Sequence, residues 1–162
     1  MKNISFISIF IICIGLLAIM PEAIAKAYYA TEEEMIERSE AIAIVDITNV
    51  ENKMTRSKPF NYRQIADANV LQVFKGSLPQ NLKLHGMEDF ICAQVNFSPG
   101  RYLVFLNRDG DLWAGSNWYL SARPIKDNLV EWYNPSGEYR ELLWQPLDKV
   151  VERVQKFILG AL

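Results

Sequence analysis

Two side chains in the sequence are of the types that perform nucleophilic or acid–base catalysis. His85 is the only histidine, and Cys92 is the only cysteine apart from Cys13 in the apolar N-terminal run. A catalytic cysteine–histidine pair needs both groups within hydrogen-bond reach, with a third group to orient the base. Their spacing does not require this contact, and alternation with Leu84 predicts that His85 faces outward. The sequence therefore names no catalytic residue, and we expect a protein that is not an enzyme.

Oxygen-rich side chains that could hold a metal ion occur in two places. Asn107, Asp109 and Asp111 alternate like the first ligands of a calcium loop, but the glycine is misplaced and no bidentate glutamate follows. A hairpin turn at Asp109-Gly110 explains them more simply. The run Glu32–Glu34 is explained by the start of a helix, where acids stabilise the positive end of the dipole. Because one cysteine cannot build a zinc site, we expect no metal and no other cofactor.

Aromatic residues are concentrated in the last third of the chain and supply the candidate partner surface. Adjacent residues of a strand point to opposite faces, so one member of each adjacent aromatic pair is expected to be exposed. Exposed aromatic side chains contact partner proteins or stack on sugars. The alternative, that most of them cover the core beneath a C-terminal helix, stays open. The candidate surface residues are Trp118, Tyr119, Trp132 and Tyr133.

Residues 1–25 have the order of features that marks a secretory signal peptide. Lys2 supplies the positive charge, residues 4–20 form an uncharged apolar run, and Ala23-Ile24-Ala25 is a site that signal peptidase accepts. Cleavage after residue 25, or two residues later, places the mature protein outside the cytoplasm, either periplasmic or secreted. An uncleaved anchor is the alternative, and this leader would then be the protein's contact with a membrane.

The mature chain, residues 26–162, has the size and composition of a single globular domain. Half of the sequence is apolar, and no repeat or low-complexity segment divides it. The net charge of −2 lacks the basic excess of proteins that neutralise phosphates, which argues against a nucleic-acid partner. Cys92 has no second mature cysteine to pair with, so it is either a buried thiol or part of an intermolecular disulfide.

Hydrophobic periodicity predicts a mainly β domain with a short N-terminal helix and an amphipathic C-terminal helix. Thr31 can cap the first helix, and Glu34 completes a capping box. The last helix begins near Pro146, buries one apolar stripe and ends at Gly160. Between the helices we expect a small antiparallel β-barrel of five or six strands, because closure leaves no exposed edge. The expected strands are residues 40–50, 61–75, 82–85, 101–106, 112–121 and 128–133, with a polar loop over 51–60.

Three segments of the chain share their pattern with a known family. They are Ser39–Val45 behind the acidic helix, Val70–Gly76 at the end of the long strand, and Pro99–Leu106 after the cysteine region. Over residues 31–121 the chain resembles the netrin-like, or tissue-inhibitor-of-metalloproteinases-like, domain in the form found in bacterial secreted proteins. The resemblance implies an OB-like barrel and contact with a protease. The animal inhibitors act through an N-terminal cysteine, and no cysteine lies near the mature terminus here, so no inhibitory residue is carried over.

The sequence therefore leads to one expected function and one alternative. We expect a secreted or periplasmic, non-enzymatic binding module that contacts another extracytoplasmic protein and, as the resemblance implies, regulates a protease. The alternative is a glycan-contacting protein of the cell envelope that uses an exposed aromatic surface.

Overall fold

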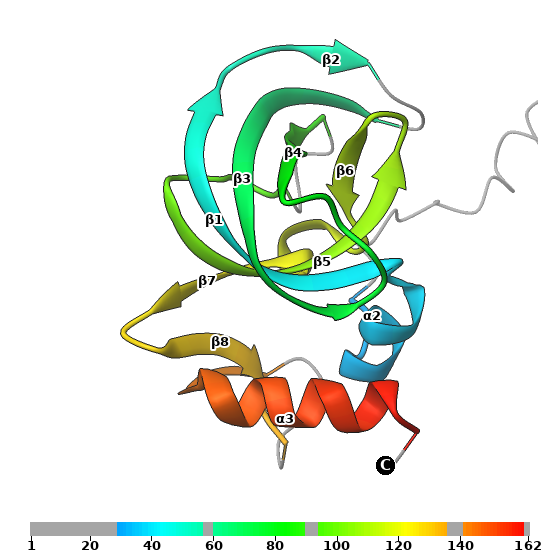
Figure 1. The fold of residues 1–162 in the computed structure, drawn as a ribbon, viewed down its shortest axis with the longest axis vertical. Helices are drawn as coiled ribbons and strands as arrows, with labels where there is room; N and C mark the ends of the chain where they lie inside the picture. Colours follow the sequence, from blue (N-terminus) through cyan, green and yellow to red (C-terminus); the bar gives the residue numbers. More distant parts are fainter. Residues whose placement is uncertain (1–28, 57–59, 90–93, 136–140, 161–162) are drawn as a thin grey trace, which may run out of the picture.

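The computed structural model describes residues 29–56, 60–89, 94–135 and 141–160. Within these residues the chain forms nine strands, two α-helices and one 3-10 helix (Figure 1). The expected leader and Cys92 lie outside the described residues. The elements in chain order are α2 (Glu32–Arg38), β1 (Ala41–Glu51), β2 (Thr55–Arg56), β3 (Asn61–Lys75), β4 (Asn81–Glu88), β5 (Gly100–Asp109), β6 (Leu112–Gly115), η1 (Trp118–Ser121), β7 (Ala122–Lys126), β8 (Leu129–Tyr133), β9 (Leu142–Pro146) and α3 (Leu147–Ile158).

Both helices form as their local sequence predicts. The Thr31 hydroxyl accepts a hydrogen bond from the Glu34 backbone N–H at 3.2 Å, and the Glu34 carboxylate accepts one from the Thr31 N–H at 2.9 Å. This capping box satisfies two backbone donors that a helix start otherwise leaves unpaired. The apolar stripe of α3 is also confirmed, because Val150 and Val154 are fully buried on it.

The strands of the first two thirds of the chain pair into a closed ring. β1 pairs with β3 on one side and with β5 on the other, both antiparallel. β3 continues to β4, β4 to β6 and β6 to β5, so the pairing returns to β1. The β4–β6 pair is parallel, through Leu84 and Trp113. We call β1, β3, β4, β5 and β6 the ring; from it β7, β8 and β9 extend towards α3 (Figure 1).

β1 and β5 serve two hydrophobic cores because alternate side chains of a strand point to opposite faces. Ala43 and Val45 of β1 pack with Val104 of β5 in a core built from the strands of the ring. Ile42 of β1 and Phe105 of β5 belong to a second core, which α2, β8 and α3 complete. The second core covers part of the outer face of the ring, and it attaches the helices to β1 and β5.

The predicted mainly β fold with two helices is confirmed, and two details of the prediction are wrong. β3 has the predicted bounds, but the strand expected over residues 112–121 ends at Gly115. Trp118 has φ 43°, a left-handed value that a strand cannot contain, and η1 replaces the strand there. The described residues also form more strands than the expected five or six, and β2, β7 and β9 are the additional ones.

Candidate functional site

His85 is buried, with 4% of its surface exposed, so the prediction that it faces outward is wrong. The Tyr62 ring stacks on the imidazole with centroids 4.2 Å apart. The Thr55 hydroxyl lies 3.1 Å from Nδ1, and a carboxylate oxygen of Asp109 lies 3.5 Å from Nε2. Strand alternation points His85 and Leu84 to opposite faces of β4, but β2 and Tyr62 cover the face that carries His85. These covering groups come from other strands, so the local pattern does not reveal them.

The surroundings of His85 favour its neutral form. Burial lowers the pKa of the imidazole from its ordinary value, and the negative charge of Asp109 only partly opposes this effect. The imidazole is therefore uncharged at pH 7. In the tautomer with the proton on Nε2, Nδ1 can accept from the Thr55 hydroxyl while Nε2–H points to the Asp109 carboxylate.

A lowered pKa predicts that His85 reduces stability in mild acid. The unfolded chain takes up the proton first, near the ordinary value of about 6.5, so the free energy of unfolding falls as pH drops from 7.5 through the lower folded pKa. We expect His85→Phe, which keeps a ring against Tyr62, to be less sensitive to this pH change than the wild type. Urea unfolding of both proteins at pH 7.5 and 5 measures it. The prediction is contradicted if the unfolding free energies of the wild type and His85→Phe differ by the same amount at both pH values.

Glu88, at the end of β4, is a second buried ionisable group close to His85. It is 4% exposed, and its Oε2 accepts a hydrogen bond from the Val95 backbone N–H at 3.1 Å. Burial raises the pKa of this carboxyl, with the backbone hydrogen bonds opposing the shift. Burial, with the charges of Asp109 and Glu88, also raises the pKa of Tyr62 to about 12. Perturbed groups that cluster in this way are typical of functional sites.

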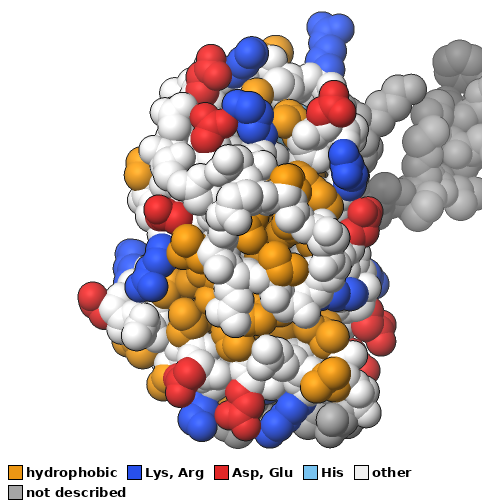
Figure 2. All heavy atoms as spheres, in the orientation of Figure 1, with side chains coloured by type: hydrophobic (Ala, Val, Ile, Leu, Met, Phe, Trp, Pro, Cys, Tyr) orange, Lys and Arg blue, Asp and Glu red, His pale blue; other side chains and the backbone are white. Residues whose placement is uncertain are grey.

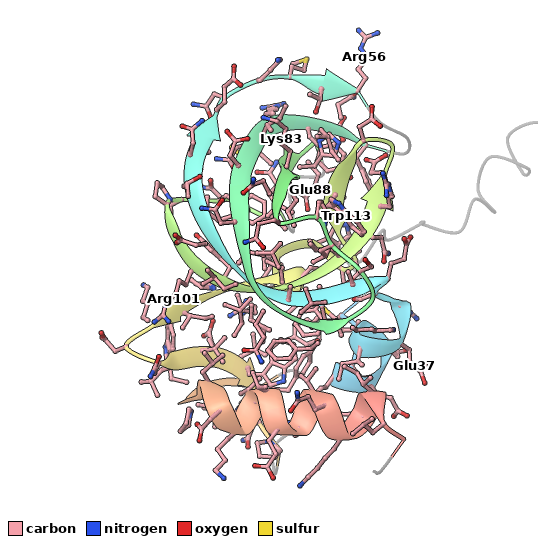
Figure 3. The ribbon with its side chains drawn as sticks, in the orientation of Figure 1. Glu37, Arg56, Lys83, Glu88, Arg101 and Trp113 are labelled. Atoms are coloured by element: carbon pink, nitrogen blue, oxygen red, sulfur yellow. The ribbon has the colours of Figure 1, made fainter. Side chains whose placement is uncertain are left out.

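A cavity of about 100 Å³ opens among these residues. Figure 3 shows Glu88 among the strands of the ring, whereas Glu37 and Arg56 point away from the molecule. The cavity lies between the start of β3 and the end of β4 on one side and β6 and η1 on the other. We call it the Glu88 cavity; it is lined by Phe60, Tyr62, His85, Glu88, Gly115, Ser116 and Trp118.

A larger and more open groove of about 400 Å³ lies between α3 and the outer face of β1 and β3. Its apolar floor is Ile44, Leu147 and Val151. Gln72 of β3 lines the groove, whereas its exposed neighbours Leu71 and Val73 are not among the lining residues. Figure 2 shows apolar side chains gathered over the region between the ring and α3. We call this cavity the α3 groove; its other lining residues are Asn128, Asp148, Glu152 and Gln155.

A third cavity, of about 440 Å³, lies over β3, β4 and the tip of the β5–β6 hairpin. Three of its charged side chains, Asp67, Lys83 and Arg108, have partners within the lining. The Lys83 ammonium lies 2.6 Å from an Asp67 carboxylate oxygen, and the Arg108 guanidinium lies over the Trp113 ring at 5.7 Å. Since these charges already have partners, the cavity has less capacity to attract a charged ligand.

The structure separates the four candidate aromatic residues. Tyr119 is exposed and Trp118 is half-buried in η1, but Trp132 and Tyr133 are both buried. The expectation that one of Trp132 and Tyr133 faces solvent is therefore wrong. Trp132 stacks on Phe105 at 5.0 Å, and the Tyr133 hydroxyl donates to the Ala30 carbonyl at 2.7 Å. The residues that cover Trp132 and Tyr133 come from β5 and from the segment at the start of α2, which a prediction from strand alternation does not consider.

The remaining candidates have structural roles in the described part of the chain. The Asn107 side chain accepts a hydrogen bond from the Glu40 backbone N–H at 2.9 Å, which joins β5 to the start of β1. Glu32 accepts hydrogen bonds from the Trp132 indole and the Arg153 guanidinium. No group of three or more His, Cys, Asp or Glu side chains among the described residues is placed to hold a metal ion.

Sequence reasoning missed two parts of the site. Glu88 lies at the end of a strand in a polar context, so nothing in the local pattern marks it as buried. The floor of the α3 groove joins Ile44 of β1 to Leu147 and Val151 of α3, which lie far apart in the chain, so no local pattern marks it. In the described part of the chain, neither helix has the length and apolar character that crossing a membrane requires. The chain matches no protein family model, no curated protein and no solved structure.

Proposed function

We propose that this protein is an extracytoplasmic, non-enzymatic binding module of the OB type that contacts another protein through the α3 groove. The observation that carries the proposal is the apolar floor of that groove, formed by Ile44, Leu147 and Val151 within a polar rim. Contiguous exposed apolar surface rimmed by polar groups is typical of protein interaction sites.

The order of strands in the ring supports the OB-type assignment. Numbered along the chain without β2, the ring strands pair in the order 1-2-3-5-4 and back to 1, with the third and fifth parallel. This order is typical of the five-stranded barrel of the OB fold. The bulges in β1–β3 pairing, for example between Ile44 and Val45, provide the bending that a small barrel needs. The proposed location outside the cytoplasm rests on the leader, residues 1–25.

A protein partner is favoured over a glycan by the positions of the aromatic side chains. A sugar-binding platform needs several exposed aromatic faces in one surface. Of the four candidates, the burial of Trp132 and Tyr133 leaves Tyr119 and the half-buried Trp118. The α3 groove instead combines an apolar floor with amide and carboxylate groups at its rim, as the cores and rims of protein interfaces do.

Charge placed on the groove is expected to prevent partner capture. Val151→Glu puts a carboxylate on the apolar floor of the groove, where a partner must bury apolar surface, so capture of the partner by cross-linking in intact cells should fall by roughly tenfold or more. Quantitative mass spectrometry of the cross-linked material from wild type and variant measures this. Met54→Glu is the matched control, because Met54 is exposed and is not among the groove residues. If the two variants and the wild type capture the same proteins equally, the groove is not the binding surface.

A further inference from the structure

The Glu88 cavity combines three aromatic side chains with one buried carboxylate. Phe60 and Tyr62 line it from the start of β3, Trp118 from η1, and Glu88 from the end of β4. Its volume of about 100 Å³ is well below the roughly 300–1,000 Å³ of sites for drug-sized ligands. The cavity is therefore suited to one small group, such as the head of a ligand.

The charge distribution of the cavity favours a positive ligand. Aromatic rings present a negative face, which attracts cations, and a carboxylate adds a full negative charge. Among the described residues that line the cavity, none carries a positive charge. His85 is held in its neutral form by burial, and Tyr62 remains a neutral phenol. Asp109, on the far side of His85, adds further negative potential.

The backbone near the cavity supports a binding role. Trp118 adopts a left-handed φ of 43°, a conformation that costs energy for a residue with a large side chain and that is enriched at ligand sites. Burying the Glu88 carboxyl also costs free energy, because burial disfavours its charged form. A bound cation would offset this second cost, since it would pair with the carboxylate.

We propose that the Glu88 cavity binds the head of a small organic ammonium ion, with Glu88 as the counter-ion and Phe60, Tyr62 and Trp118 as the surrounding rings. Methylated ammonium groups are the favoured class. They shed water more easily than a primary ammonium or a metal ion, and their methyl groups contact aromatic faces, which is how aromatic cages select them. This inference is independent of the α3 groove, because the two sites share no residue.

Choline and tetramethylammonium are the probes that test the proposal. Titration of the purified full-length chain, followed by the indole N–H signals in NMR spectra and by calorimetry, should give saturable binding of both. The neutral isostere 3,3-dimethylbutan-1-ol has the shape of choline without its charge, and it should bind at least roughly tenfold more weakly. Vesicles of phosphatidylcholine, compared with phosphatidylglycerol, distinguish a lipid head group from a free amine as the source of the ammonium. Binding of the isostere as tightly as choline, or no saturation by either cation, would overturn the proposal.

Two variants test whether choline binds in the Glu88 cavity. Glu88→Gln removes the charge while its amide oxygen can still accept from the Val95 N–H, so the fold should survive and choline affinity should fall by roughly tenfold or more. Trp118→Leu removes one ring of the cage and provides a second, independent loss. Trp144→Leu is the control, because that tryptophan is exposed on β9 and lies outside the cavity. Choline affinity that is unchanged in both cavity variants would refute the assignment.

Discussion

Replacing Trp132 with alanine is expected to lower the free energy of unfolding by about 3–5 kcal/mol, the usual cost of removing a buried aromatic side chain. Trp132 is fully buried in the second core, where its ring stacks on Phe105 with centroids 5.0 Å apart. Its indole N–H also donates to the Glu32 carboxylate at 2.6 Å, and the same oxygen accepts from Arg153 at 2.8 Å. One side chain thereby joins β8, the ring, α2 and, through Glu32, α3.

The measurement is urea or guanidinium unfolding followed by circular dichroism. Trp144→Ala is the matched control, since that tryptophan on the next strand is 48% exposed, and its loss should cost less than about 1 kcal/mol. Equal destabilisation by the two variants would show that the second core does not hold β8 and the helices on the ring. Because α3 forms one wall of the α3 groove, Trp132→Ala should also weaken partner capture, whereas Trp144→Ala should not.

Gly76→Ala is the second large expected effect, with a loss of about 2–4 kcal/mol of unfolding free energy. Gly76 follows the end of β3 with a left-handed φ of +73°, which costs a residue with a Cβ about 1 kcal/mol or more. In addition, a Cβ there would lie 2.2 Å from the Glu40 carbonyl oxygen. That oxygen belongs to the backbone just before β1, so it cannot rotate away, and overpacking of this kind costs about 1–3 kcal/mol.

A second glycine separates the two causes of this effect. Gly110, at the tip of the β5–β6 hairpin, has φ +62°, but a Cβ added there would meet no other atom within 4 Å. Gly110→Ala therefore measures the backbone strain alone, about 1 kcal/mol. Thermal or chemical unfolding of both variants measures the difference. If Gly110→Ala were as destabilising as Gly76→Ala, the close approach of Glu40 would have no energetic role.

The two proposed binding sites depend differently on the two hydrophobic cores. The Glu88 cavity is built from ring strands and η1, whereas the α3 groove requires α3 to be docked on the outer face of β1 and β3. A variant that loosens the second core should therefore impair the groove first. Trp132→Ala is expected to reduce partner capture while choline binding persists at temperatures where the ring remains folded, and this comparison tests whether the sites are separable.

Local elements of this protein were determined by the sequence itself. The capping box at Thr31 and Glu34, the hairpin at Asp109-Gly110 and the apolar stripe of α3 all formed as predicted. Each depends on hydrogen bonds or spacing within a few residues, so the information is contained in a short segment. The long strand β3 was also predictable, because its β-branched and alternating residues extend over many positions.

The tertiary structure alone decided which side chains are buried and which meet. Trp132 is covered by α2, whose Glu32 lies 100 residues earlier in the chain, and His85 is covered by Thr55 and Tyr62 of neighbouring strands. Alternation describes the two faces of a strand, but it does not say whether one face or both will be covered. The Glu88 cavity and the α3 groove arise where elements from distant parts of the chain come together and leave space between them, and packing of that kind is fixed only when the whole chain has folded.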